Sequence, residues 1–255
     1  MCGRWKCGAQ TPNERAAGAP KEGDAVLIVI SVRFALLLKD DFSGATLADG
    51  GQRFFVDGRP ARPVRKPEGF FVFTGEERES WDVRIESARY FPRTVHIRAA
   101  DLAPGMPLCT VRLYRRPHCG FADCGWLETF APPGCLAAAL ADTDPPLTLK
   151  GLNGGLRLRG YTARNLTGCR VCVGEGDTAE LFALTTRLPD GYGVDRPARH
   201  DHGEGEPVRL AFCAVADETG RCSIPVHPGT GPAQIRWYDE EAMQWREISC
   251  ARAHS

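Results

Sequence analysis

The sequence predicts an all-β protein: two β-sandwich-like units joined by a Pro/Cys-rich connector. Two observations favour this fold class. Short apolar runs alternate with Gly, Pro and Asp turns through most of the chain, as in successive antiparallel strands. Within several runs, apolar and polar side chains also alternate. Trp81, Val83 and Ile85 would face one side of a strand, and Asp82 and Arg84 the other.

The first unit is expected over residues 25–115, after a flexible N-terminal tail at 1–24. Its first strand, within 26–38, would be buried on both faces or carry a bulge. Asp41-Phe42-Ser43-Gly44 predicts a turn, because Asp and Ser side chains bond their own backbone and Gly accepts a positive φ. Val56-Asp57-Gly58-Arg59 predicts a hairpin of the Asp-Gly type.

The rest of the chain divides into a connector and a second unit. Residues 116–146 are rich in Pro and Cys and are expected to pack against both halves as a connector. Residues 147–255 are expected to form the second β-sandwich-like domain. Within this domain, the polar composition of residues 187–206 predicts a long loop, and long loops often carry function. Its strands are expected at 156–159, 169–173, 181–185, 208–215 and 234–238.

Composition and charge exclude some classes of partner. Lys and Arg number 32, as do Asp and Glu, so the formal net charge is zero. A dedicated nucleic-acid binder would carry a basic excess, so we expect no nucleic-acid partner. The most apolar run, 25–38, is shorter than the roughly 20 residues of a membrane span, so we expect no membrane partner. The first 23 residues lack the apolar core of a signal peptide, which predicts cytoplasmic synthesis. The chain would then stay in the cytoplasm, or leave by a route that needs no N-terminal signal, for example within a released particle.

Four segments of the first unit share the pattern of a known family. They are the turn at 41–44, the strand end at 55–58, Glu68-Gly69-Phe70-Phe71-Val72-Phe73, and the strand at 81–85 followed by Ala88-Arg89-Tyr90. Through them, residues 26–98 resemble the carboxypeptidase regulatory-like (transthyretin-like) β-sandwich domain. The resemblance implies a portable module and leaves function open. The chain has no His-x-x-Glu pair, so the likeness does not extend to the catalytic carboxypeptidase domain.

The N-terminus offers one candidate nucleophile. Met1-Cys2-Gly3-Arg4 resembles the start of abasic-site-binding proteins, which expose Cys2 beside its own amine after Met removal. The other segments of that family are missing from this chain. A coincidence at the start codon is therefore the favoured interpretation.

Eleven cysteines raise the question of a metal site. In a reducing compartment we expect them to be small apolar core residues. Two cysteine groupings could instead hold zinc: Cys169 and Cys172 with Cys213 and Cys222, or His118, Cys119 and Cys124 with Cys109 or Cys135. On a strand, residues i and i+3 point to opposite faces, which argues against the first grouping.

A third candidate metal site is His200-Asp201-His202-Gly203-Glu204, which places two imidazoles and a carboxylate within five residues. Neighbouring Arg196 and Arg199 favour a solvated loop instead. None of these groups assembles into a recognisable catalytic or cofactor motif. We therefore assign no catalytic, cofactor-binding or metal-ligating residue.

Aromatic residues supply the candidate binding surface. Tyr90, Phe91, Trp237 and Tyr238 lie near predicted strand ends and are expected at a protein interface, where Tyr and Trp are enriched. The sequence thus predicts a non-enzymatic structural or interaction protein, an adaptor that binds other subunits of a larger assembly, for example a phage-tail-like or contractile particle. The alternatives are a carbohydrate- or surface-binding adhesin, with 70–73 and 81 as a stacking platform, and a Cys2- or metal-dependent enzyme.

Overall fold

The computed structural model describes residues 31–144, 146–152, 156–159, 165–231, 233–239 and 244–247. Within these ranges nearly all regular structure is β, which confirms the all-β fold class. The described residues include two short 3-10 helices, η1 (Ala99–Asp101) and η2 (Gly176–Thr178). Neither has the length or the apolar character that crossing a membrane requires.

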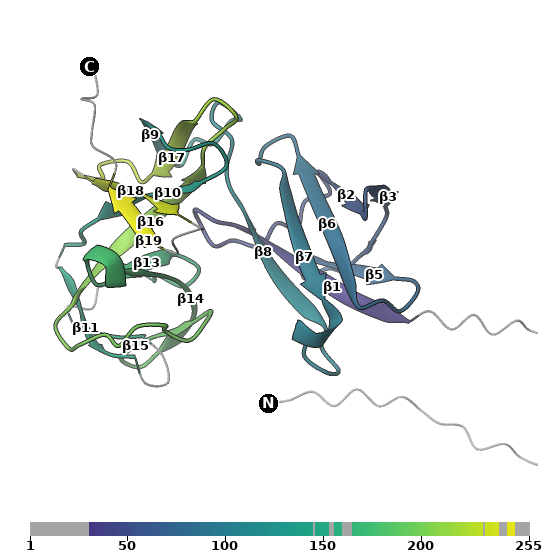
Figure 1. The fold of residues 1–255 in the computed structure, drawn as a ribbon, viewed down its shortest axis with the longest axis horizontal. Helices are drawn as coiled ribbons and strands as arrows, with labels where there is room; N and C mark the ends of the chain where they lie inside the picture. Colours follow the sequence, from purple (N-terminus) through teal and green to yellow (C-terminus); the bar gives the residue numbers. More distant parts are fainter. Residues whose placement is uncertain are drawn as a thin grey trace, which may run out of the picture. The chain divides into compact units, whose positions relative to one another are not determined.

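The first unit consists of two four-stranded sheets (Figure 1). One has the order β4-β5-β1-β8, in which β1 is antiparallel to β5 and parallel to β8. Its strands are β1 (Val32–Asp40), β4 (Val64–Arg65), β5 (Phe70–Thr74) and β8 (Leu108–Leu113). The other has the order β3-β2-β6-β7 and is antiparallel throughout. Its strands are β2 (Gln52–Val56), β3 (Arg59–Ala61), β6 (Ser80–Ser87) and β7 (Arg93–Arg98).

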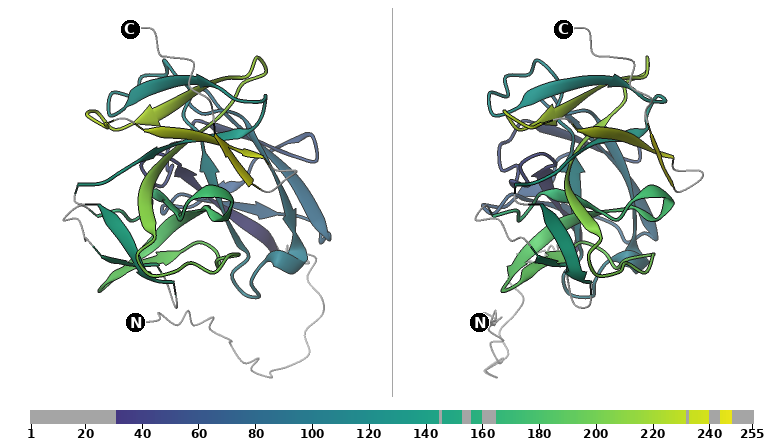
Figure 2. Two further views of the ribbon diagram at one scale, coloured as in Figure 1. Left: turned by 60° about the vertical axis from the view of Figure 1, so that its left-hand side comes forward. Right: turned by 90° about the vertical axis from the view of Figure 1, so that its left-hand side faces the viewer.

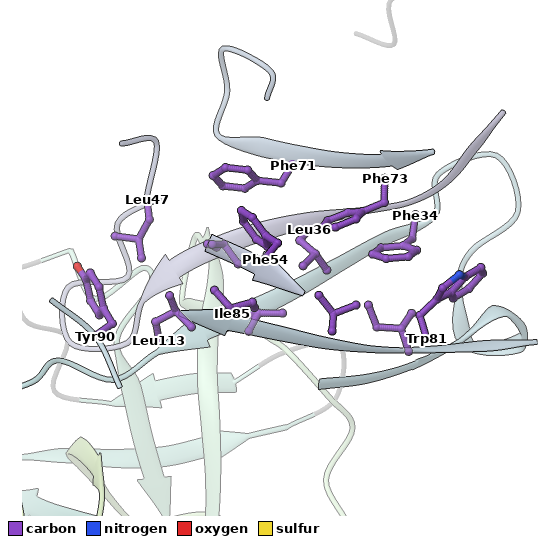
Figure 3. Packing of buried hydrophobic residues seen from close by; sticks show 14 residues of the cluster. Phe34, Leu36, Leu47, Phe54, Phe71, Phe73, Trp81, Ile85, Tyr90 and Leu113 are labelled. Atoms are coloured by element: carbon purple, nitrogen blue, oxygen red, sulfur yellow. The ribbon is translucent and has the colours of Figure 1, made fainter. Parts of the chain in front are cut away.

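Apolar side chains from both sheets meet in one core (Figure 3). Phe34 stacks on Phe73 with ring centroids 4.6 Å apart, and Trp81 lies against Phe34 at 5.0 Å. The alternation predicted for residues 81–85 of β6 is confirmed: Trp81, Val83 and Ile85 are buried, and Asp82 and Arg84 are exposed. The hairpin between β2 and β3 is also confirmed, with positive φ at Asp57 and Gly58 as an Asp-Gly turn requires.

In the second unit, six strands close into a ring. They follow the order β11-β12-β15-β14-β13-β16, and an additional pairing between β11 and β16 completes the circuit. The ring encloses a core of Leu, Val, Phe182 and Tyr192 side chains. Its strands are β11 (Leu147–Gly151), β12 (Leu156–Arg159), β13 (Arg170–Val173), β14 (Glu180–Leu188), β15 (Gly191–Val194) and β16 (Pro207–Val215).

Five further strands extend this unit beyond the ring. Beyond β16 the sheet continues in the order β10, β18, β19. These strands are β10 (Leu136–Ala141), β18 (Gln234–Asp239) and β19 (Gln244–Glu247). A two-stranded ribbon of β9 (Gly125–Phe130) and β17 (Arg221–Val226) packs on β10 and β16 (Figure 2). On the face of the sheet that the ribbon covers, β10 presents small side chains, which permit close packing. They are Ala137, Ala139 and Ala141.

Two sequence expectations differ from the structure. Residues 116–146 contain β9 and β10, so this stretch belongs largely to the sheets of the second unit and is not a plain connector. Prolines bracket these strands and hide their short apolar runs. The expected loop at 187–206 contains β15, because Tyr192 is buried in the ring and Gly191 lets two backbones meet. A Cβ on Gly191 would lie 2.0 Å from the Leu156 carbonyl oxygen.

Candidate functional site

The candidate site is the junction between the two units, and it begins at the turn after β1. Gly44 has a φ of +69°, and Ser43 Oγ accepts the Ala45 N–H at 3.3 Å, as the sequence predicts. The acidic residue that bonds the turn backbone is Asp40, whose Oδ1 accepts the Phe42 N–H at 3.3 Å. The expectation had placed this role on Asp41. Asp41 is instead available to bind residues of the second unit.

Asp41 forms the centre of a buried ionic contact between the units. Its side chain is only 2% exposed, and its Oδ1 lies 2.6 Å from Arg170 Nε of β13 and 3.6 Å from Arg112 Nη1 of β8. Burial disfavours the charge of Arg170, but the interactions with its neighbours, of which that with the Asp41 carboxylate is the strongest, together outweigh this effect and raise the pKa of the guanidinium. Arg170 therefore stays charged and ties the second unit to the first.

Backbone contacts continue the junction. Arg112 Nη1 donates to the Gly168 carbonyl at 2.9 Å, across the two units. Gly168 lies directly against Gly44, and a Cβ added to Gly44 would lie 2.3 Å from Gly168 Cα. Both glycines have positive φ. No other residue type fits either position without displacing the backbone of the opposite glycine.

Phe42 carries the apolar part of the junction. It extends from the first unit into the core that β10, β16 and β17 form in the second. Its ring centroid lies 4.6 Å from that of His227 and 5.9 Å from that of Phe212. Only 6% of Phe42 is exposed, so the turn of one unit completes the core of the other.

Arg115 contacts the turn after β1 through Asp40 and Phe42. It donates to both Oδ atoms of Asp40 and to both Oδ atoms of Asp123, and its guanidinium lies 4.4 Å from the Phe42 ring centroid and 4.3 Å from that of Phe121. Hydrogen bonding to Arg115 lowers the pKa of Asp123. Arg115 is 4% exposed and Asp40 is 3% exposed, so their ion pair is shielded from water, whereas the side chain of Asp123 is 57% exposed.

The four predicted interface residues lie in different environments. Tyr90 is 4% exposed and belongs to the first core, so the expectation that it is exposed is wrong; burial raises its pKa to about 12. Its ring packs against Phe121 at 5.6 Å, which the strand-end position did not reveal. Phe91, Trp237 and Tyr238 are half-buried. Their role as a protein interface stays a prediction.

The cysteine groupings do not converge. Cys172 and Cys213 lie in one buried cluster, whereas Cys222 belongs to another. Burial raises the pKa of Cys172 to about 11 and that of Cys222 to about 12, which disfavours the thiolate a metal needs. Over the described ranges, no three His, Cys, Asp or Glu side chains are placed to share a metal ion. Cys2 lies outside the described residues.

The His-rich loop is organised by hydrogen bonds. His202 has a fully buried side chain whose Nδ1 lies 2.7 Å from Glu206 Oε2, and the Gly203 N–H donates to Glu206 Oε1 at 2.8 Å. Burial opposes the charge of Glu206, but these hydrogen bonds outweigh it and lower its pKa. This local bonding fits a structural loop.

The aromatic residues proposed as a sugar-stacking platform are mainly core residues. Phe71, Phe73 and Trp81 are each 6% exposed or less, and only Phe70 is half-buried. Their rings pack on Phe34 and Phe54 within the first unit.

Comparison of the chain with known protein families, curated proteins and solved structures found no match. The resemblance of residues 26–98 to the transthyretin-like family therefore stays a prediction. Sequence reasoning missed the junction residues Arg112 and Arg170. Their only sequence signal is an arginine within an apolar strand, which by itself does not name a partner.

Proposed function

We propose that this protein is a non-catalytic adaptor that binds other protein subunits within a larger assembly. The junction is the observation that carries the proposal. Asp41, Phe42 and Arg170 join the two β units through buried ionic and apolar contacts. An adaptor must hold two binding surfaces at a fixed separation, and a junction of this kind supplies that rigidity.

Two surface features suit protein partners. Tyr238 and Trp245 pack with ring centroids 5.3 Å apart beside a cavity of about 210 Å³ that Leu136 and Leu181 also line. Phe130, at the end of β9, is 71% exposed. Among the described strands β9 pairs only with β17, so its other edge offers backbone groups for an added strand. A subunit of a phage-tail-like or contractile particle is one concrete form of the proposal.

Native size fractionation tests this function. A lysate of the source cells is separated by size, and the chain is followed by mass spectrometry. We expect it in fractions far above its own 27.9 kDa, together with a constant set of partner proteins. Migration as a free monomer would contradict the proposal.

Variants then locate the contact. Phe130→Ser should release the chain from the large fractions, because it removes an exposed apolar anchor. Val64→Ser is the matched control, since Val64 is also an exposed apolar residue, 51% exposed on β4 of the first unit. Equal release by both variants would argue against docking at β9.

A further inference from the structure

A basic cleft lies beside the junction. It has a volume of about 600 Å³ and is lined by residues of β1, β7 and β8 in the first unit and of β13 and β14 in the second. Its basic side chains outnumber its carboxylates, Asp101 and Asp195, although the chain as a whole has no net charge. The basic residues are Lys39, Arg93, Arg98, Arg112 and Arg170.

Three of these cations already have carboxylate partners. Arg98 forms two hydrogen bonds with Asp101, at 2.8 and 3.0 Å. Arg112 and Arg170 both face Asp41. The remaining carboxylate, Asp195, uses Oδ1 to accept the Ala183 N–H at 2.8 Å.

Lys39 and Arg93 have no carboxylate partner among the residues that the structure describes. Arg93 donates to the Arg112 carbonyl at 2.5 Å, and its guanidinium lies 5.4 Å from the Tyr114 ring centroid. Lys39 is half-buried and pairs in register with Arg112 on the neighbouring strand. Burial, together with the charge of Arg112, lowers the pKa of Lys39. An anion in the cleft would compensate both charges.

Part of the remaining lining of the cleft is apolar. Leu102 and Leu108 lie there next to the charged groups, together with the polar side chains of Thr110 and Thr185. The volume lies within the range of roughly 300–1,000 Å³ typical of small-molecule sites. A ligand that fits both parts carries a charged group and an apolar or ring-shaped body.

We infer that this cleft binds a small organic anion, through phosphate or carboxylate groups held by Lys39 and Arg93. Guanidinium groups bind both kinds of oxyanion with paired hydrogen bonds, and the Lys39 ammonium adds a point charge. The site is distinct from the protein-docking surfaces of the adaptor proposal. The cleft is also lined by Arg170, Thr185 and Asp195 of the second unit, so its ligand would lie beside the junction.

Titration calorimetry on the full chain tests the site with magnesium-free ATP, citrate and inorganic pyrophosphate as probes. We expect saturable binding of at least one probe. ATP binding would identify phosphate as the recognised group, and binding of citrate alone would identify carboxylate. Weaker binding of pyrophosphate than of ATP would show that the apolar wall contributes. If none of the three binds, the inference is wrong.

Matched lysine variants localise the binding. Lys39→Met should lower the affinity for the bound probe about tenfold or more, because a charge-assisted contact is lost. Lys39→Arg should retain most of the affinity. Lys66→Met is the control, since Lys66 is an exposed lysine outside the cleft. Binding should also take up a proton at alkaline pH, because the anion raises the lowered pKa of Lys39. Equal affinity in Lys39→Met and Lys66→Met would overturn the assignment.

Discussion

At the residue scale, Arg115 combines more interactions than any neighbour at the junction. It bonds two carboxylates, Asp40 and Asp123, and contacts the Phe42 and Phe121 rings. Asp40 is 3% exposed, so this guanidinium is the charged partner of a carboxylate that water hardly reaches. Replacing one member of a buried ion pair leaves the other without compensation, which costs more than the pair itself contributes.

We expect Arg115→Met to lower the free energy of unfolding by about 3 to 5 kcal/mol. Denaturant unfolding measures the change. Arg116→Met is the control: Arg116 is exposed and only faces the Phe91 ring, so its loss should cost about 1 kcal/mol or less. Adding Asp40→Asn to Arg115→Met should restore part of the stability, because it removes the uncompensated charge. A loss below about 1 kcal/mol in Arg115→Met would contradict the account.

At the element scale, two turns from distant parts of the chain fit together only because both contain glycine. Gly44 follows β1 and Gly168 precedes β13, and their backbones touch. Each has a positive φ, which suits glycine, and each would also clash if it carried a Cβ. The sequence pattern identifies Gly44 as a turn residue but not as the contact point of two units.

Gly168→Ala should therefore destabilise the protein more than a turn glycine elsewhere. Its Cβ would lie 2.8 Å from Gly44 Cα. Gly134 is the matched control, with φ +79° and open space around its Cβ position. We expect Gly134→Ala to cost roughly 1 kcal/mol from the backbone alone, and Gly168→Ala about 2 kcal/mol more from the clash. Equal shifts of the thermal midpoint in both variants would show that the close contact is not formed.

The sequence could predict elements with clear alternation but not those whose burial depends on distant strands. β6 shows a regular period of two, and its inward face is as expected. β10 reads Leu-Ala-Ala-Ala-Leu-Ala, without alternation, because both of its faces are covered, by other parts of the second unit and by Phe42 and Tyr114 of the first. Tyr90 follows the same logic: it is buried in the first core and against Phe121, about thirty residues later, and no local pattern indicates these contacts.

At the scale of the whole molecule, the described residues from 31 onward belong to one compact unit. Phe42 couples the two β units, since it follows β1 of the first unit in sequence but its side chain is buried in a core of the second. Large buried contacts between β units favour joint unfolding, whereas small polar ones permit separate unfolding.

We expect the wild-type protein to unfold in one cooperative transition. Phe42→Ala should split it into two, because the variant empties the apolar contact at the junction. Hydrogen exchange followed at β6 and β14 reports the two units separately. Phe54→Ala is the control: Phe54 lies in the first core, away from the junction, so this variant should lower stability but preserve a single transition. Two transitions in the wild type would show that the junction does not couple the units.

The all-β class, the Asp-Gly hairpin, the turn at Gly44 and the alternating faces of β6 could be predicted from the sequence, since each follows from local backbone preference or from a period of two. The folded chain was needed to show that six strands close into a ring, that Asp41 faces Arg170 across 129 positions of sequence, and that Lys39 borders a basic cleft. The reason is physical. Local patterns specify which side of a strand is apolar, whereas ring closure, ion pairing and clefts depend on which distant strands that side meets.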